Sequence, residues 1–361
     1  MKIRHLVFVG LLLVGAAVLL AACGGGPAAS GDSEEVLYFY NWSEYIEPEL
    51  FDKFKEETGI SVIEDTFSSN EDLLAKLQSG AEGYDVIVPS DYMVDQMIDL
   101  DMLAELDHSK ITSIGDIDPS FADPPFDPGM AHCLPYMWGT TGIGFNWNDW
   151  DEAPDSWSYL FEPDLAANFA GRISFLDDSR ETLGAALIYL GYDPNTTDAA
   201  QIEEAKNVIL AIKPYIAAFD SDSYEDNLLS GEFGLVHGWS GDIFTAQLED
   251  ENIDYAIPRE GAVKWVDNLC ITADAGADPA RYERALKWID FLNQPENAGA
   301  NTNFVWYATP NMNATPYIDQ EILDYEAVYP PEEVFAKLHW LEPLGDALEI
   351  YDRAWTEITS Q

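Results

Sequence analysis

Hydrophobic patterns typical of strands and of helices alternate along residues 35–103. The strand-like segments are short runs of β-branched, aromatic and other apolar residues, and the helix-like segments have an amphipathic spacing. We expect strands at 35–42, 60–67 and 84–90 and helices at 48–59, 69–80 and 91–103. Pro48 and Gly59 mark the two ends of the first helix, and Ser69 and Asp72 have the spacing of a capping box. This alternation predicts parallel βαβ units.

A second α/β unit is expected over roughly residues 141–264, and the stretch from about 312 is expected to be mostly helical. The chain has 361 residues, of which 47% are hydrophobic, so it can bury a substantial core in two domains. We assign one lobe to residues 36–140 plus 266–311 and the other to 141–265 plus 312–361. The expected fold class is therefore α/β, with a ligand cleft between two lobes, beyond the carboxyl ends of strands.

The N-terminal segment has the pattern of a secretory signal peptide, assigned to residues 1–22. A basic start precedes an apolar run over residues 6–20, which is too short for a comfortable membrane span. The sequence LAAC at 20–23 resembles a bacterial lipobox, which implies lipid attachment to Cys23; an ordinary signal peptide that contains a cysteine is the alternative. Residues 23–35 read as the lipidated cysteine and a flexible tether. We expect an exported protein, anchored by lipid to the outer face of the cytoplasmic membrane or in the periplasm.

The strongest compositional signal is negative charge. The chain has 17 Lys and Arg against 66 Asp and Glu, which gives a formal net charge of −49 at pH 7. Nucleic acid and anionic membrane surfaces are therefore poor partners, whereas a cationic ligand would be attracted. Because this charge exceeds what one small cation needs, we expect most of it to be a solvated surface suited to a salty medium.

Aromatic and carboxylate side chains recur together at the expected carboxyl ends of strands. The segments are LYFYNWSEY, VIVPSDY, ISFLDDSRE, LVHGWSGD, VKWVDN and FVWYATPN. Aromatic faces pack on methylene chains and attract ammonium groups at roughly 0.5–2 kcal/mol per contact, and carboxylates accept charge-assisted hydrogen bonds of about 1.5–3 kcal/mol each. Such a box fits an aliphatic polyamine. For any single pair the alternative is a structural role, in which the tryptophan belongs to the core and the polar residue caps a helix. Asp91, Ser179 and Asp242 could each be such caps.

Enzyme and metal signatures are missing from the sequence. GWSGD ends in Asp242 and is not G-x-S-x-G, and GTTGIG lacks both the dinucleotide-binding spacing and a P-loop lysine. The stretch from Asp220 to Asn227 lacks the glycine and the later glutamate of a calcium loop, so we interpret it as a solvated acidic loop. We expect no enzymatic activity, no cofactor and no metal site.

Two cysteines remain beyond the N-terminal segment. In an exported protein Cys133 and Cys270 could form a disulfide, or they could be two buried free thiols.

Seven motifs carry a specific resemblance. LYFYNWSEYI, YDVIVPSDYMV, LPYMWGTTGIGFN, DDSRETLGAAL, GWSGD, WVDNLCI and YATPN resemble the periplasmic spermidine/putrescine-binding proteins of polyamine ABC transporters, in family order from about residue 36 onward. The resemblance implies a two-lobed class II binding protein, each lobe a mostly parallel sheet flanked by helices. It also implies a monomer that closes on its ligand and delivers it to a permease served by a cytoplasmic ATPase.

The resemblance also implies a set of ligand-binding residues. The aromatic members are Trp42, Tyr45, Tyr92, Trp239, Trp265 and Tyr307. The acidic members are Glu44, Asp178, Glu181, Asp242 and Asp267, with Ser43 and Ser90 as neutral hydrogen-bond partners. Trp265 and Asp267 rank highest because their strand matches the motif most closely tied to diamine recognition.

The resemblance leaves the preferred polyamine open. GWSGD is more similar to putrescine-preferring members, and a glutamine of spermidine binders would align with Leu341, beside Glu342. For the cysteines it implies segments that run side by side, and hence a Cys133–Cys270 disulfide as a hypothesis. The alternatives to a polyamine transporter component are a binding protein for another organic cation or polar solute, a sensor or adhesin without transport, and an extracytoplasmic hydrolase.

Overall fold

The computed structural model describes residues 35–81 and 83–360. The expected signal peptide, the expected lipidation site Cys23 and nearly all of the expected tether lie outside these residues. The strands are β1 Glu35–Trp42, β2 Ile60–Phe67, β3 Val86–Ile87, β4 Cys133–Asn146, β5 Ile173–Phe175, β6 Ile216–Phe219, β7 Leu235–Trp239, β8 Ile253–Ala256, β9 Ala262–Ile271 and β10 Leu338–Trp340. The first strand therefore begins at the last residue that we assigned to the tether.

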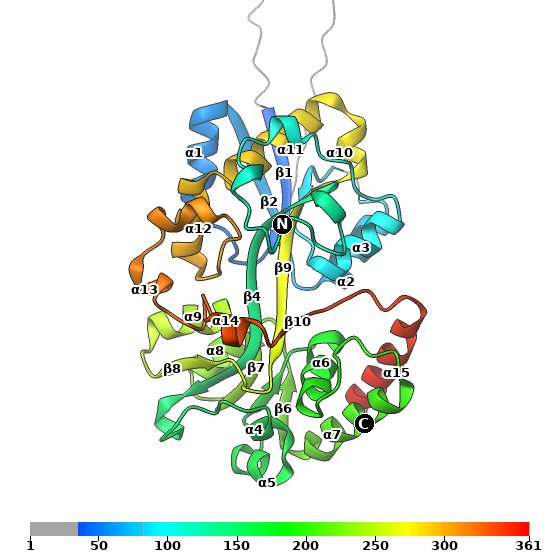
Figure 1. The fold of residues 1–361 in the computed structure, drawn as a ribbon, viewed down its shortest axis with the longest axis vertical. Coiled ribbons are helices and arrows are strands. Elements are labelled where there is room, and N and C mark those ends of the chain that lie inside the picture. Colours follow the sequence, from blue (N-terminus) through cyan, green and yellow to red (C-terminus); the bar gives the residue numbers. More distant parts are fainter. Residues whose placement is uncertain (1–34, 82, 361) are drawn as a thin grey trace, which may run out of the picture. The chain divides into compact units, whose positions relative to one another are not determined.

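Two long antiparallel strands, β4 and β9, form the middle of the sheet. Within the described residues the order is β2-β1-β3-β9-β4-β7-β5-β6, with β10 paired to β9 and β8 paired to β4. The pairs β1/β2, β1/β3, β5/β6 and β5/β7 are parallel, as the strand–helix alternation predicts. Figure 1 shows β4 and β9 side by side through the centre, with α1, α2, α3, α10 and α11 toward one end and α4, α5, α6, α7 and α15 toward the other.

Helices cover both groups of parallel strands. They are α1 Glu49–Thr58, α2 Asn70–Gln78, α3 Asp91–Asp99, α4 Ser158–Phe161, α5 Pro163–Ala166, α6 Ser179–Tyr189, α7 Ala199–Ile212, α8 Tyr224–Leu229, α9 Ser240–Glu249, α10 Ala273–Ala277, α11 Pro279–Leu292, α12 Pro295–Val305, α13 Gln320–Leu323, α14 Glu332–Phe335 and α15 Leu348–Thr359. No helix in this described part of the chain combines the length and apolar composition needed to cross a membrane.

The local sequence signals explain the helix ends of the first unit. Gly59 adopts φ 77° and ends α1, a conformation that glycine reaches without steric cost. Ser69 accepts a hydrogen bond of 3.1 Å from the backbone N–H of Asp72 and caps α2, as expected. The expected strand at 84–90 is shorter, since only Val86–Ile87 pairs as β3.

The C-terminal stretch is less helical than we expected. Between Met312 and Thr359 it contains the short helices α13 and α14, the strand β10 and only one long helix, α15. β10 runs parallel to β9, with Leu338 opposite Ala262. This pairing is with a strand about seventy residues earlier, and so the local pattern gave no sign of it.

Two cysteines and several large aromatic side chains stabilise the region around β1, β4 and β9. Cys133 lies directly opposite Cys270 in the β4/β9 ladder, and the two form a disulfide. Beside β1, Phe39 and Phe54 pack edge-on against Trp288 of α11, with ring centroids 5.6 and 4.8 Å apart. Burial of such rings is worth about 1.5–3 kcal/mol each, so this end of the sheet is held rigidly.

Candidate functional site

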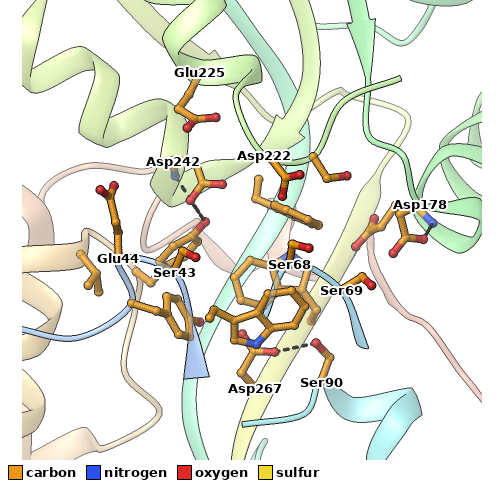
Figure 2. Close-up of a pocket in the computed structure, with 18 of the residues that line it drawn as sticks. Ser43, Glu44, Ser68, Ser69, Ser90, Asp178, Asp222, Glu225, Asp242 and Asp267 are labelled. Carbon is orange, nitrogen blue, oxygen red and sulfur yellow. Dashed lines mark hydrogen bonds between the residues drawn. The ribbon is translucent and has the colours of Figure 1, made fainter. Parts of the chain in front are cut away.

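A cavity of about 640 Å³ opens at the carboxyl ends of β1 and β7, over the middle of β9 and beside the starts of α3, α6 and α9. All thirteen side chains predicted to bind ligand line it. Eleven carboxylates line it in all, and its lining contains no Lys, Arg or His. Figure 2 shows Asp178 across the pocket from Glu44 and Asp242, with Asp267 and Ser90 near one another in between.

Asp267 lies in the floor of the cavity, on β9. The Ser90 hydroxyl donates to its Oδ1 at 2.6 Å, and Asn70 Nδ2 donates to Ser90 Oγ at 3.0 Å. Asn70 Oδ1 in turn accepts from the Ser90 backbone N–H at 3.1 Å. The side chain of Asp267 is only 5% exposed, and this burial raises its pKa to about 7. A cation placed beside Asp267 would therefore favour its charged form.

Aromatic rings surround this carboxylate. Trp265, two residues before Asp267 and on the same strand face, packs against Tyr307 with centroids 5.1 Å apart, and Tyr45 packs against Tyr307 at 5.3 Å. Trp42 is held by a 2.9 Å hydrogen bond from its indole Nε1 to the Val88 carbonyl. These rings are fixed before any ligand arrives, which reduces the entropy lost on binding.

Asp242 lies in the first turn of α9, and two tyrosine side chains hold its carboxylate. Tyr307 donates its hydroxyl to Oδ1 and Tyr224 donates to Oδ2, each at 2.7 Å. Burial raises the pKa of Asp242, the tyrosine hydrogen bonds oppose the rise, and the nearby Glu44 adds to it. Tyr224 was not predicted as part of the site. Its role is to position Asp242, and no local pattern indicated it.

Asp178 and Glu181 stand at the start of α6. Asp178 Oδ1 accepts from the backbone N–H groups of Arg180 and Glu181 at 2.8 and 3.0 Å, so Asp178 is the N-cap of α6 rather than Ser179. The Glu181 side chain is 5% exposed, and its Oε2 has no hydrogen-bond partner. Burial, and then the charge of Asp178, raise the pKa of Glu181 well above its usual value. The alternative that Asp91 and Asp242 are helix caps is likewise excluded, because α3 starts after Ser90 and α9 after Trp239.

Tyr92 connects the cavity to α2. Its hydroxyl donates to Glu71 Oε1 at 3.2 Å. Burial, and then the charge of Asp178, raise the pKa of Glu71 to about 7. The cluster of mutually repelling acids thus extends beyond the cavity wall, and a bound cation would relieve part of that repulsion.

The acidic stretch Asp220–Asn227 was wrongly interpreted as a loop exposed to solvent alone. Asp222, Glu225 and Asp226 line the cavity, and Asp222 and Glu225 are drawn in Figure 2. Burial, followed by the charge of Asp242, raises the pKa of Glu225 to about 8. The signal that could have found these residues is their position just after β6, another strand with its carboxyl end at the same edge.

The C-terminal segment contributes an apolar residue to the cavity. Leu341 lines it, whereas the neighbouring Glu342 does not. Glu342 is exposed. Its backbone N–H donates to Asn195 Oδ1 at 2.7 Å, and its backbone carbonyl accepts from Arg180 Nη2 at 3.0 Å. The carboxylate of Glu342 therefore does not replace a polar group at position 341.

The acids of the cavity do not resemble a metal site. Within residues 35–81 and 83–360, no group of three or more His, Cys, Asp or Glu side chains is arranged to hold a metal ion. What the cavity offers is hydrogen-bond acceptors spaced along walls of aromatic rings. That combination suits an elongated organic cation with several N–H donors.

Comparisons with known proteins agree with this geometry. Residues 49–330 match the family described as "Bacterial extracellular solute-binding protein". The chain is 37% identical over 357 residues to the spermidine/putrescine-binding periplasmic protein of Escherichia coli strain K12, covering 98% of this chain and 97% of the relative.

Solved structures show the same fold. The spermidine/putrescine ABC transporter substrate-binding protein PotD of Streptococcus pneumoniae is similar with a TM-score of 0.79 and 34% identity, and the TpPotD lipoprotein of Treponema pallidum with 0.79 and 30%. Each comparison covers 90% of this chain and 99% of the solved one.

Proposed function

Because the chain belongs to the bacterial extracellular solute-binding protein family, we propose that it captures a polyamine, putrescine or spermidine, outside the cytoplasm and delivers it to an ABC permease. The family consists of solute-binding proteins, and the chain is not an enzyme. The names of the relatives supply the ligand class, and the chemistry of the cavity supplies an independent reason for it.

The single observation that supports this proposal best is the charge of the cavity. Eleven carboxylates line it without any Lys, Arg or His among them. Each buried acid disfavours the ionised state of its neighbours, so a neutral or anionic solute would leave that repulsion in place. A polyamine relieves it, since each ammonium group can donate charge-assisted hydrogen bonds of about 1.5–3 kcal/mol each to the carboxylates.

In this proposal the side chains divide into two roles. Trp265 and Tyr307, whose rings are 5.1 Å apart, would pack on the methylene groups of the ligand. Asp267, Asp242 and Glu181 would bind ammonium groups at different points along the cavity. The remaining predicted side chains would complete the walls: Trp42, Ser43, Glu44, Tyr45, Ser90, Tyr92, Asp178 and Trp239.

Ligand capture in this proposal involves two lobes and a hinge. The lobes would be residues 36–140 plus 266–311 and residues 141–265 plus 312–361. β4 and β9 would pass between them, since the proposed lobe boundaries fall within these two strands, and β9 pairs with β3 on one side while β4 pairs with β7 on the other. A cation held by groups from both lobes would favour the closed state and create the surface that the permease recognises.

The proposal also includes a lipid anchor at Cys23, after a signal peptide over residues 1–22. Its support is the LAAC sequence and the similarity to the TpPotD lipoprotein of Treponema pallidum. Metabolic labelling with a radioactive fatty acid tests it: the label should be incorporated by the wild type and not by Cys23→Ser.

Thermal unfolding with a panel of ligands tests the function. The panel is putrescine, spermidine, lysine and choline, each at low and high salt. A ligand at about a hundred times its dissociation constant should add roughly 2.7 kcal/mol of stability. We expect putrescine or spermidine to stabilise the protein strongly and to do so at high salt. A strong response to choline or lysine alone would favour another organic cation, and equal small shifts erased by salt would refute a specific cation site.

A further inference from the structure

One buried acid of the cavity has no role in the site as described so far. Asp91 is the first residue of α3, is only 1% exposed, and lines the cavity. Its Oδ1 accepts from the backbone N–H of Tyr92 at 2.7 Å. Its Oδ2 is buried and accepts no hydrogen bond of normal distance and angle among the described residues, although the backbone N–H of Val266 is near enough to the carboxyl to lower its pKa. A buried carboxylate oxygen without a hydrogen-bond partner lowers the stability of the protein. A bound ligand that donates a hydrogen bond to it would remove this penalty.

The charged groups that act on Asp91 come from two other elements. Asp267 acts from β9, and Arg180 and Glu181 act from the start of α6. Burial, and then the charge of Asp267, raise the pKa of Asp91 to about 8, although Arg180 opposes the rise. Asp91 is therefore protonated at neutral pH while the cavity is empty.

Arg180 is engaged elsewhere. Its Nη2 donates to Asn195 Oδ1 and to the Glu342 carbonyl, both at 3.0 Å, and its guanidinium lies 5.3 Å from the centre of the Tyr351 ring. None of the hydrogen bonds that Arg180 makes among the described residues goes to Asp91, and the Nε of Arg180 has no hydrogen-bond partner there. Glu181 Oε2 is likewise buried without a partner. Two carboxylate oxygens of the cavity, one on α3 and one on α6, thus lack a hydrogen-bond donor.

We propose that Asp91 is a ligand carboxylate, which supplies counter-charge to an ammonium group held between Asp267 and Glu181. This inference rests on the proposed function, because it requires a cationic ligand in the cavity. An alkylammonium has three N–H donors, enough to satisfy Asp91 Oδ2 and Glu181 Oε2 together. When the ammonium enters, the proton of the Asp91 carboxyl leaves for the buffer and the carboxylate remains, so that binding releases a proton.

A purely structural role for Asp91 has a different signature. An acid in the first turn of a helix stabilises the helix by about 0.3–1 kcal/mol. Asp91→Asn keeps an oxygen for the Tyr92 N–H and removes only the charge. A structural role would then lower the unfolding temperature of the empty protein, whereas removal of a buried acid of raised pKa alone would leave it unchanged or raise it; a ligand role would change the affinity and the number of protons released.

Isothermal titration calorimetry on the full chain tests the proposal, with putrescine and spermidine as probes at pH 8. The variants are Asp91→Asn, Asp91→Ser as a second neutral residue suited to a helix start, and Asp346→Asn as an exposed acid outside the cavity. We expect at least about a tenfold loss of affinity in both Asp91 variants, from the loss of one charge-assisted contact, and none in Asp346→Asn. Titrations at pH 7 in two buffers of different ionisation enthalpy should show about one proton fewer released by Asp91→Asn.

The outcomes separate this inference from the function on which it depends. Wild-type protein that binds neither probe would refute the proposed function. Wild-type protein that binds while both Asp91 variants keep its affinity and its proton release would refute the role of Asp91 alone. Lower affinity of both variants with an unchanged proton count would also overturn it, because the loss would then come from packing rather than from charge.

Discussion

Replacement of Asp267 by Asn should have opposite effects on ligand binding and on the stability of the empty protein. Asp267 is 5% exposed and accepts a side-chain hydrogen bond from Ser90, and the Tyr45 hydroxyl is near enough to lower its pKa as well. Asn offers the same oxygen to Ser90 in nearly the same volume. The change therefore removes a charge and little else.

The size of the binding effect follows from the contact that is lost. At pH 8 the Asp267 carboxylate would contribute one charge-assisted hydrogen bond to the polyamine, worth about 1.5–3 kcal/mol. Its removal should raise the dissociation constant by about 10- to 150-fold. Calorimetric titration of wild type, Asp267→Asn and the exposed control Asp346→Asn measures this directly.

The stability effect has the opposite sign. Burial raises the pKa of Asp267 to about 7, above that of an unfolded aspartate, so the native state holds a proton that the unfolded state has lost between about pH 4 and 7. Stability consequently falls as the pH rises through this window, by up to ~4 kcal/mol at pH 8. Asp267→Asn abolishes that penalty, and the unliganded variant should unfold at a higher temperature than wild type at pH 8 and at a similar temperature at pH 4.

Two results would contradict this reasoning. An unliganded variant less stable than wild type at pH 8 would mean that the Asp267 charge is compensated within the protein. An unchanged affinity would mean that the ammonium groups bind elsewhere in the cavity.

Three further predictions follow from the same structure. Polyamine affinity should rise from pH 6 to pH 8, because burial raises the pKa of Asp267 to about 7 and that of Glu225 to about 8, and protonated carboxyls cannot pair with ammonium; calorimetry that finds a flat or falling profile would refute this. Gly139→Ala should weaken binding by about tenfold and stability by roughly 1–3 kcal/mol, because a Cβ there would lie 2.6 Å from the Trp265 ring; Gly115→Ala, with open space around its Cβ, is the matched control for titration and thermal unfolding. Peptide mapping after thiol labelling of denatured, unreduced protein should find Cys133 and Cys270 unlabelled, and loss of their bond should cost about 2–5 kcal/mol of unfolding free energy; labelling of both would show free thiols.

The local organisation of this protein could be predicted from its sequence. Hydrophobic periodicity located the strands and helices of the first unit, and Gly59 and Ser69 marked helix ends because their backbone and side-chain preferences act within a few residues. The two-residue period of a strand placed Trp265 and Asp267 on one face. The rule that strands of one orientation end at one edge correctly brought together the residues after β1 and β7, and all the predicted side chains line one cavity. The rule was wrong for two segments, because Trp265 and Asp267 lie within β9, which runs antiparallel to β3, and Tyr307 follows helix α12 rather than a strand.

Tertiary structure decided which partner each of those side chains contacts. Ser90 donates to Asp267, 177 residues away, and Tyr224 and Tyr307 together hold Asp242. Such contacts depend on the pairing of distant strands, which a local pattern does not encode. The sequence did not determine burial either, since the acids after β6 were interpreted as solvated surface although several of them line the cavity. Charge and residue type are local properties, but solvation and the pKa of a carboxyl depend on everything packed around it, and so only the folded chain determines them.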